Sequence, residues 1–135
     1  MTASAWERTG RPTMSHCAQT SRVLQILHLR KKFDFIATRD DVALGKPDPE
    51  IYTLVARELG VSADECLVIE DSATGIKAAL AAGMRCIAVT TKFTRTAVHA
   101  SGLLDDPWIV DTPSDLQTVV ERFKDCVDRG AAEQE

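Results

Sequence analysis

Residues 66–84 read CLVIEDSATGIKAALAAGM, and this stretch decides the fold that we expect for the chain. The run begins with four apolar residues, as is typical of a strand buried on both faces of a parallel sheet. Glu70 and Asp71 end that run, and an alanine-rich segment then continues to a stop at Gly83. The stretch therefore predicts a strand, a short acidic turn and a helix in direct succession.

The same alternation of strand and helix extends on both sides of this stretch. We expect strands at residues 33–38, 66–69, 85–90 and 108–110, and helices at residues 15–29, 49–59, 73–82 and 114–127. Strands that alternate with helices predict an α/β fold in which helices cover both faces of a parallel sheet. Ligands of such sheets bind beyond the carboxyl ends of the strands, which here selects residues 38–46, 70–75 and 90–94.

Glu70 and Asp71 are the strongest candidates for a metal site. Two adjacent carboxylates at the end of a buried strand repel each other and lose hydration, which is costly unless a cation bridges them. Magnesium prefers such oxygen ligands. Successive strand residues point to opposite faces, so both acids reach one ion only if the strand has ended by Asp71. The alternative interpretation is that the acids only stabilise the positive end of the helix.

Lys46 lies in the loop Gly45-Lys46-Pro47-Asp48-Pro49. Gly45 allows a close approach of the backbone and the prolines stiffen the loop, so the ammonium group is held in place. A fixed cation suits a phosphoryl group, whose oxygens carry negative charge in the transition state. A solvated loop lysine is the alternative.

Thr13 and Ser15 precede the first expected helix. Hydroxyl and N–H groups at such a position hold phosphate oxygens, and simple N-capping is the alternative.

Composition excludes several classes of protein. The formal net charge is −4 and the pI is near 5.4, whereas surfaces that bind nucleic acids or membranes are basic. No apolar run approaches the ~20 residues of a membrane span, and no signal peptide is visible. We therefore expect a cytoplasmic protein with neither nucleic-acid nor membrane partners. The cysteines form no CxxC pair, and we expect small buried thiols in a reducing compartment at Cys17, Cys66, Cys86 and Cys126.

The sequence GKPDPEIY at residues 45–52, followed by the quoted stretch, closely resembles the haloacid dehalogenase-like hydrolases. Within that superfamily it is similar to the branch of phosphoglycolate phosphatases and beta-phosphoglucomutases. FDFIATRDDV at residues 33–42 also fits, and the resemblance covers residues 13–94. It implies a Rossmann-like three-layer sandwich with a parallel sheet.

The resemblance also implies roles for the candidate residues. Lys46 would orient the phosphoryl group and neutralise the nucleophile, and Glu70 and Asp71 would hold Mg²⁺. Gly75, in the pattern D-S-x-x-G, would let the loop pack closely. Thr13, with Ser15 beside it, would bind the transferred phosphoryl group. Thr20 is a competitor for that position, but it leaves too short a helix before residue 29.

The sequence also departs from the family pattern. The family begins with an apolar strand ending in D-x-D-G-T, which carries the nucleophile, and these residues contain no such motif. The helical cap domain is absent as well. We therefore expect an irregular leader at residues 1–12, a partial core domain at 13–129 and a frayed tail at 130–135. Open edges of the incomplete sheet are expected to cause self-association.

The leading functional hypothesis is a phosphatase that hydrolyses small phosphomonoesters through a phospho-aspartate, here without the nucleophile segment. We expect this chain alone to be inactive. The alternatives are a sugar phosphomutase of the same branch and a non-catalytic remnant that binds magnesium or phosphate. A receiver-type signalling domain is disfavoured because its acidic pair precedes its lysine, whereas Lys46 here precedes Glu70 and Asp71.

Overall fold

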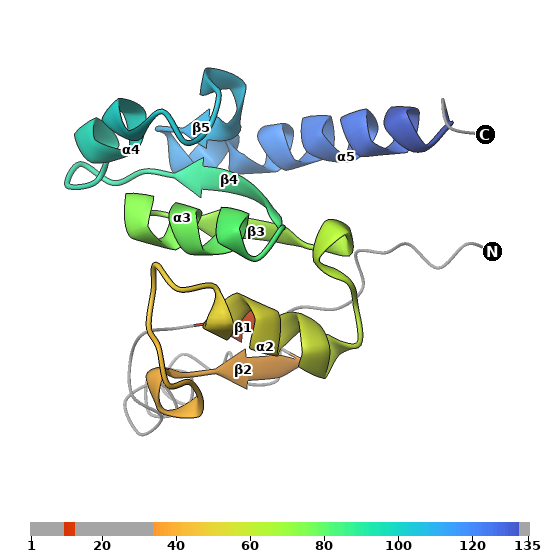
Figure 1. Cartoon of the computed structure of the whole chain (residues 1–135). Coiled ribbons are helices and arrows are strands. Elements are labelled where there is room, and N and C mark those ends of the chain that lie inside the picture. Colours follow the sequence, from red (N-terminus) through yellow and green to blue (C-terminus); the bar gives the residue numbers. More distant parts are fainter. Residues whose placement is uncertain (1–9, 13–33, 133–135) are drawn as a thin grey trace. The chain divides into compact units, whose positions relative to one another are not determined.

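The computed structural model describes residues 10–12 and 34–132 (Figure 1). Within these residues strands and helices alternate, as the sequence predicts. The strands are β1 (Gly10–Pro12), β2 (Phe35–Ala37), β3 (Leu67–Glu70), β4 (Arg85–Val89) and β5 (Ile109–Val110). The helices are α2 (Glu50–Leu59), α3 (Ala73–Ala81), α4 (Arg95–Ser101) and α5 (Leu116–Ala132). The helix expected at residues 15–29, and with it Thr13 and Ser15, lies outside the described residues.

The strands form two sheets. Strands β1 and β2 pair in parallel, with Gly10 opposite Phe35 and Pro12 opposite Ala37. The other sheet has the order β3-β4-β5, and β5 lies parallel to β4 with Ala88 opposite Ile109. The parallel neighbours β4 and β5 are joined through helix α4, which confirms the α/β class.

The chain divides into two compact units. The first unit comprises Met1–Leu67 and Lys77–Arg85, and the second comprises Val68–Ile76 and Cys86–Glu135. The sequence predicts one partial core domain at 13–129, and that boundary stays a prediction.

Helix α2 organises the first unit by packing against β1 and β2. Its buried residues recur at helical spacing and so form one apolar face: Ile51, Tyr52, Val55, Ala56 and Leu59. A side chain at Gly10 would overlap Val55, so β1 approaches the helix through a bare backbone. Gly60 ends α2 in the left-handed conformation, with φ of 69°.

The core of the second unit lies between its sheet and its helices. Ile87, Val98 and Val110 are buried there, and Val119 and Phe123 of α5 are buried as well. The rings of Trp108 and Phe123 meet edge to face, with their centroids 5.8 Å apart. Val119 and Phe123 lie within the helix that the sequence predicts at residues 114–127.

Three features differ from the sequence-based expectations. Gly10–Pro12 forms a strand although an irregular leader was expected at 1–12. Glycine and proline have low β propensity, and the pairing with β2 stabilises the strand instead. Helix α5 continues to Ala132, into the tail expected to fray from residue 130. Helix α4 was not predicted, since Val98 is its only buried residue and its apolar periodicity is correspondingly weak.

The cysteine prediction holds only in part among the described residues. Cys86 is buried, Cys66 is half-buried, and Cys126 is exposed on α5. Burial raises the pKa of the Cys66 thiol, with the neighbouring charges of Glu65 and Asp64 adding to the effect.

Candidate active site

Glu70 and Asp71 occupy different environments although they are adjacent. Glu70 is the last residue of β3 and is 9% exposed, whereas Asp71 follows the strand and is exposed. The strand has therefore ended at Asp71, which is the condition under which both carboxylates reach one ion. The Asp71 N–H donates to Glu70 Oε2 at 3.2 Å.

Gly75 lies directly against the buried acid. A Cβ atom at this position would fall on the carboxylate group of Glu70, far inside any normal contact distance. Only glycine leaves room for the carboxylate there. This geometry agrees with the loop-shaping role predicted for Gly75, and the role itself stays a prediction.

Ser72 joins this group, although the sequence did not suggest a role for it. Its Oγ accepts a hydrogen bond from the Gly75 N–H at 3.1 Å, and so it caps the first turn of α3. The same hydroxyl donates to Glu70 Oε2 at 3.5 Å. A serine immediately before a helix was a visible capping signal, but its second contact depends on how the glutamate folds back.

The donor set at this turn fits a hydrated magnesium ion. Magnesium commonly takes one or two carboxylates and fills its remaining positions with water and substrate oxygens. Glu70 supplies a carboxylate fixed by its surroundings, and Asp71 supplies an exposed one. Within residues 10–12 and 34–132, no group of three or more His, Cys, Asp or Glu side chains forms an all-protein metal site.

Lys46 and Gly45 belong to the first unit. The ammonium nitrogen of Lys46 lies 5.1 Å from the centroid of the Tyr52 ring, which is 3% exposed. The negative face of an aromatic ring attracts a cation at this distance, so the Tyr52 ring helps to hold the ammonium group in place. The Asp48 N–H donates to the carbonyl of Gly45 at 3.0 Å and closes the loop, in which the Lys46–Pro47 peptide is cis.

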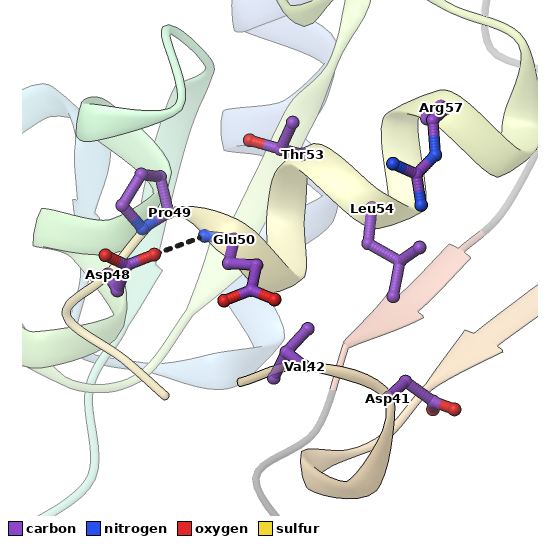
Figure 2. A pocket seen from close by; sticks show the side chains of 8 residues that line it. All are labelled: Asp41, Val42, Asp48, Pro49, Glu50, Thr53, Leu54 and Arg57. Atoms are coloured by element: carbon purple, nitrogen blue, oxygen red, sulfur yellow. Dashed lines mark hydrogen bonds between the residues drawn. The ribbon is translucent and has the colours of Figure 1, made fainter. Parts of the chain in front are cut away.

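The same loop leads into α2 through two carboxylates. Asp48 Oδ1 accepts the Glu50 N–H at 2.9 Å (Figure 2), and Pro49 is the N-cap of the helix, which begins at Glu50 rather than at residue 49. Glu50 in turn accepts the N–H groups of Ala43 and Leu44, and these bonds lower the pKa of its carboxyl group.

A hollow of about 210 Å³ opens beside the start of α2. Its lining consists of acidic and apolar side chains, one hydroxyl and one guanidinium group, as Figure 2 shows: Asp41, Val42, Asp48, Pro49, Glu50, Thr53, Leu54 and Arg57. Lys46 is not part of its lining. We assign this hollow no ligand, because its acids outnumber its one cation and its carboxylates already bind the backbone nearby.

A second polar cluster lies at the carboxyl ends of β4 and β5. The buried hydroxyl of Thr90 donates to Asp111 Oδ1 at 2.6 Å, and His99 Nε2 lies 3.0 Å from Asp111 Oδ2. Arg95 Nη2 donates to the Asp111 carbonyl at 3.0 Å. The Thr90 bond, followed by His99 and Arg95, holds the pKa of Asp111 below its ordinary value.

This cluster shows that His99 has a carboxylate partner, which the sequence did not indicate. The partner is twelve positions away, and only the packing of α4 beside β5 brings it close. Because each polar group of the cluster binds another, we interpret it as the attachment of α4 to the sheet.

The predicted site residues are thus described in two groups. Glu70, Asp71 and Gly75 come together in the second unit, and Gly45 and Lys46 form one loop in the first.

Comparison with known proteins identifies the fold. The family model of the haloacid dehalogenase-like hydrolases matches residues 12–83. The phosphorylated carbohydrates phosphatase of Thermotoga maritima is 47% identical over 64 residues, which cover 47% of this chain and 30% of that protein.

Two solved structures are also similar. One is CbbY from Rhodobacter sphaeroides in complex with xylulose-(1,5)bisphosphate, with 37% identity and a TM-score of 0.62 over 66% of this chain and 41% of the other. The second is the beta-phosphoglucomutase of Clostridium difficile, with 29% identity and a TM-score of 0.63 over 78% and 45%.

The chain spans a third or less of the length of the curated relatives it matches. These likenesses confirm the Rossmann-like α/β fold and the predicted branch, since both a phosphatase and a phosphoglucomutase are among them. The chain therefore belongs to the haloacid dehalogenase-like hydrolases.

Proposed function

We propose that this chain is the C-terminal catalytic portion of a magnesium-dependent phosphatase of small phosphomonoesters. The observation that carries the proposal is the acidic turn after β3, where Glu70 is buried against Gly75 and Asp71 is exposed beside it. A carboxylate pair held in this way at the carboxyl end of a parallel strand suits Mg²⁺ and a phosphorylated ligand. The similar phosphatase that acts on phosphorylated carbohydrates supports this substrate class.

Each candidate residue has a distinct role in the proposed reaction. A bound Mg²⁺ ion supplies positive charge to the phosphoryl oxygens, and Glu70 and Asp71 would hold it. The Lys46 ammonium, placed over the Tyr52 ring, would stabilise the charge that spreads over the phosphoryl group. Thr13 and Ser15 would bind the same group through their hydroxyls.

The nucleophile of the proposed reaction is an aspartate outside these 135 residues. The sequence contains no D-x-D-G-T motif. In the phospho-aspartate mechanism that aspartate attacks phosphorus and displaces the alcohol of the phosphomonoester, and water then cleaves the acyl phosphate to release inorganic phosphate and the free aspartate. This chain would contribute the groups that bind the phosphoryl oxygens.

A sugar phosphomutase is the second candidate, favoured by the likeness to a beta-phosphoglucomutase. In that reaction a sugar hydroxyl takes the place of water at the second step. A transfer assay with a sugar phosphate and a second sugar separates the two functions, because only a mutase moves the phosphoryl group between hydroxyls.

Metal binding by the chain itself is the first test. Titration with Mn²⁺, followed by electron paramagnetic resonance and competed with Mg²⁺, should reveal a site that Asp71→Ala weakens. Asp64→Ala, in the exposed turn before β3, is the matched control and should leave binding unchanged. Equal binding by the parent and Asp71→Ala would remove the basis of the proposal.

Activity requires the missing nucleophile. A hybrid in which these residues replace the matching part of the Thermotoga maritima phosphatase should hydrolyse phosphorylated sugars with Mg²⁺. Failure of a folded, metal-binding hybrid to hydrolyse any phosphomonoester would favour the non-catalytic remnant instead.

A further inference from the structure

The buried carboxylate of Glu70 is oriented by its own turn. A carboxylate that binds a metal is oriented by hydrogen bonds to its oxygens, because without them the carboxylate group rotates freely. Oε2 of Glu70 accepts a hydrogen bond from the N–H of Asp71 at 3.2 Å and one from the hydroxyl of Ser72 at 3.5 Å. The Asp71 donor is a backbone group, which a substitution of the side chain does not remove. The Ser72 donor is a side chain and can be removed by mutation.

The hydroxyl of Ser72 is itself fixed by the start of α3. It accepts the Gly75 N–H at 3.1 Å, and the Ser72 carbonyl accepts the Ile76 N–H at 3.0 Å. A hydroxyl that accepts from the helix still has its own proton to give. That proton is available to Oε2 of Glu70, which lies 3.5 Å from the hydroxyl oxygen.

Gly75 completes the arrangement from the other side. Because no Cβ is present, the carboxylate of Glu70 rests against the backbone of the same helical turn whose N–H binds Ser72. Glu70, Ser72 and Gly75 thus form a closed unit in which each group limits the position of the next.

We propose that Ser72 is a positioning residue for Glu70, which sets the direction of the carboxylate toward the metal and does more than cap α3. This inference rests on the magnesium site of the proposed function. If it holds, loss of the hydroxyl weakens metal binding even where the helix stays capped.

Three substitutions of Ser72 separate the two roles. Ser72→Ala removes both the cap and the donor. Ser72→Gly removes the donor, but glycine is itself a good N-cap residue, so the helix loses only a few tenths of a kcal/mol of stability. Ser72→Thr keeps both. The affinity of the full chain for Mn²⁺, measured by electron paramagnetic resonance with Mg²⁺ competition, should fall roughly 10-fold in Ser72→Ala and Ser72→Gly and recover in Ser72→Thr.

Ser62 provides a matched control. Its hydroxyl also donates to a glutamate, Glu65, in a capped turn that has no proposed ligand. Ser62→Ala therefore removes the same kind of bond and should leave Mn²⁺ affinity unchanged. A thermal unfolding scan of every variant shows how much of any change is lost folding.

The outcomes distinguish this inference from the proposed function. Parent-like affinity in Ser72→Gly, with Asp71→Ala still weakened, would overturn the positioning role and leave the metal site intact. No effect of Asp71→Ala would overturn the metal site itself. If Ser72→Ala unfolds, the affinity of Ser72→Gly decides.

Discussion

At the scale of single residues, the acidic turn is organised by burial. Glu70 and Asp71 carry the same group, but the first is enclosed by Gly75 and Ser72 whereas the second faces solvent. An enclosed carboxylate is already oriented, and an exposed one adjusts to the ion. Substitutions around Glu70 should therefore act through geometry, and those at Asp71 through charge.

Gly75→Ala should both destabilise the chain and weaken metal binding. The added methyl group overlaps the Glu70 carboxylate, and overpacking of this kind costs about 1–3 kcal/mol. Chemical denaturation and Mn²⁺ titration measure the two effects. Gly130→Ala is the control, since nothing lies within 4 Å of that position and alanine favours a helix there. A stable Gly75→Ala chain with normal affinity would contradict the close packing.

Lys46→Ala should lower kcat of the hybrid enzyme by roughly 10²-fold, because a fixed charge on the transition state is lost. The control is Arg122→Ala, since Arg122 is an exposed cation on α5 outside the three segments expected to bind ligands. That variant should keep its activity. Turnover of Lys46→Ala within about threefold of the parent would exclude the role.

At the scale of elements, α4 is held to its sheet by polar contacts. Val98 is the one residue of α4 that is buried. The contacts of Arg95 and His99 with Asp111 therefore provide much of the attachment of the helix to the sheet. The Thr90 hydroxyl ties the same carboxylate to the end of β4. Such an attachment depends on the charge of Asp111.

Acid should therefore loosen this element. The pKa of Asp111 is lower in the folded chain than in the unfolded chain, so its contribution is present at pH values above the unfolded pKa. That contribution disappears as the pH falls through the depressed folded value. Asp111→Asn should lower Tm at pH 6–7, and the difference from the parent should vanish in strong acid. A difference independent of pH would show that the charge is not responsible.

At the scale of the whole molecule, the sheets end in edges. Among residues 10–12 and 34–132, β3 is the edge of its three-stranded sheet, and its Ile69 is 45% exposed. An apolar edge strand offers unpaired backbone groups to another chain. None of the described helices is long and apolar enough to cross a membrane. The cytoplasmic location and the lack of nucleic-acid partners remain predictions.

The 135-residue chain alone should be inactive and should self-associate. Sedimentation across a range of concentrations should show dimers or larger species, and Ile69→Lys should shift them toward monomer, because a charge on an edge opposes pairing. A monomer at every concentration would contradict the association. Hydrolysis of p-nitrophenyl phosphate by the chain alone, if abolished by Asp71→Ala, would contradict the inactivity.

The sequence by itself determined the elements whose signals are local. The apolar run before Glu70, the helix that follows it and helix α2 were all predictable, because propensity, periodicity and capping act over a few residues. The position of Asp71 just past the strand also follows from that pattern.

Only the tertiary structure decided the rest. Gly10–Pro12 is a strand because β2 pairs with it, and His99 has a partner because α4 packs beside β5. Ser72 contacts Glu70 because the absence of a side chain at Gly75 lets the carboxylate fold back onto the helix. These contacts depend on how separate groups meet in space, and composition and periodicity do not predict such contacts.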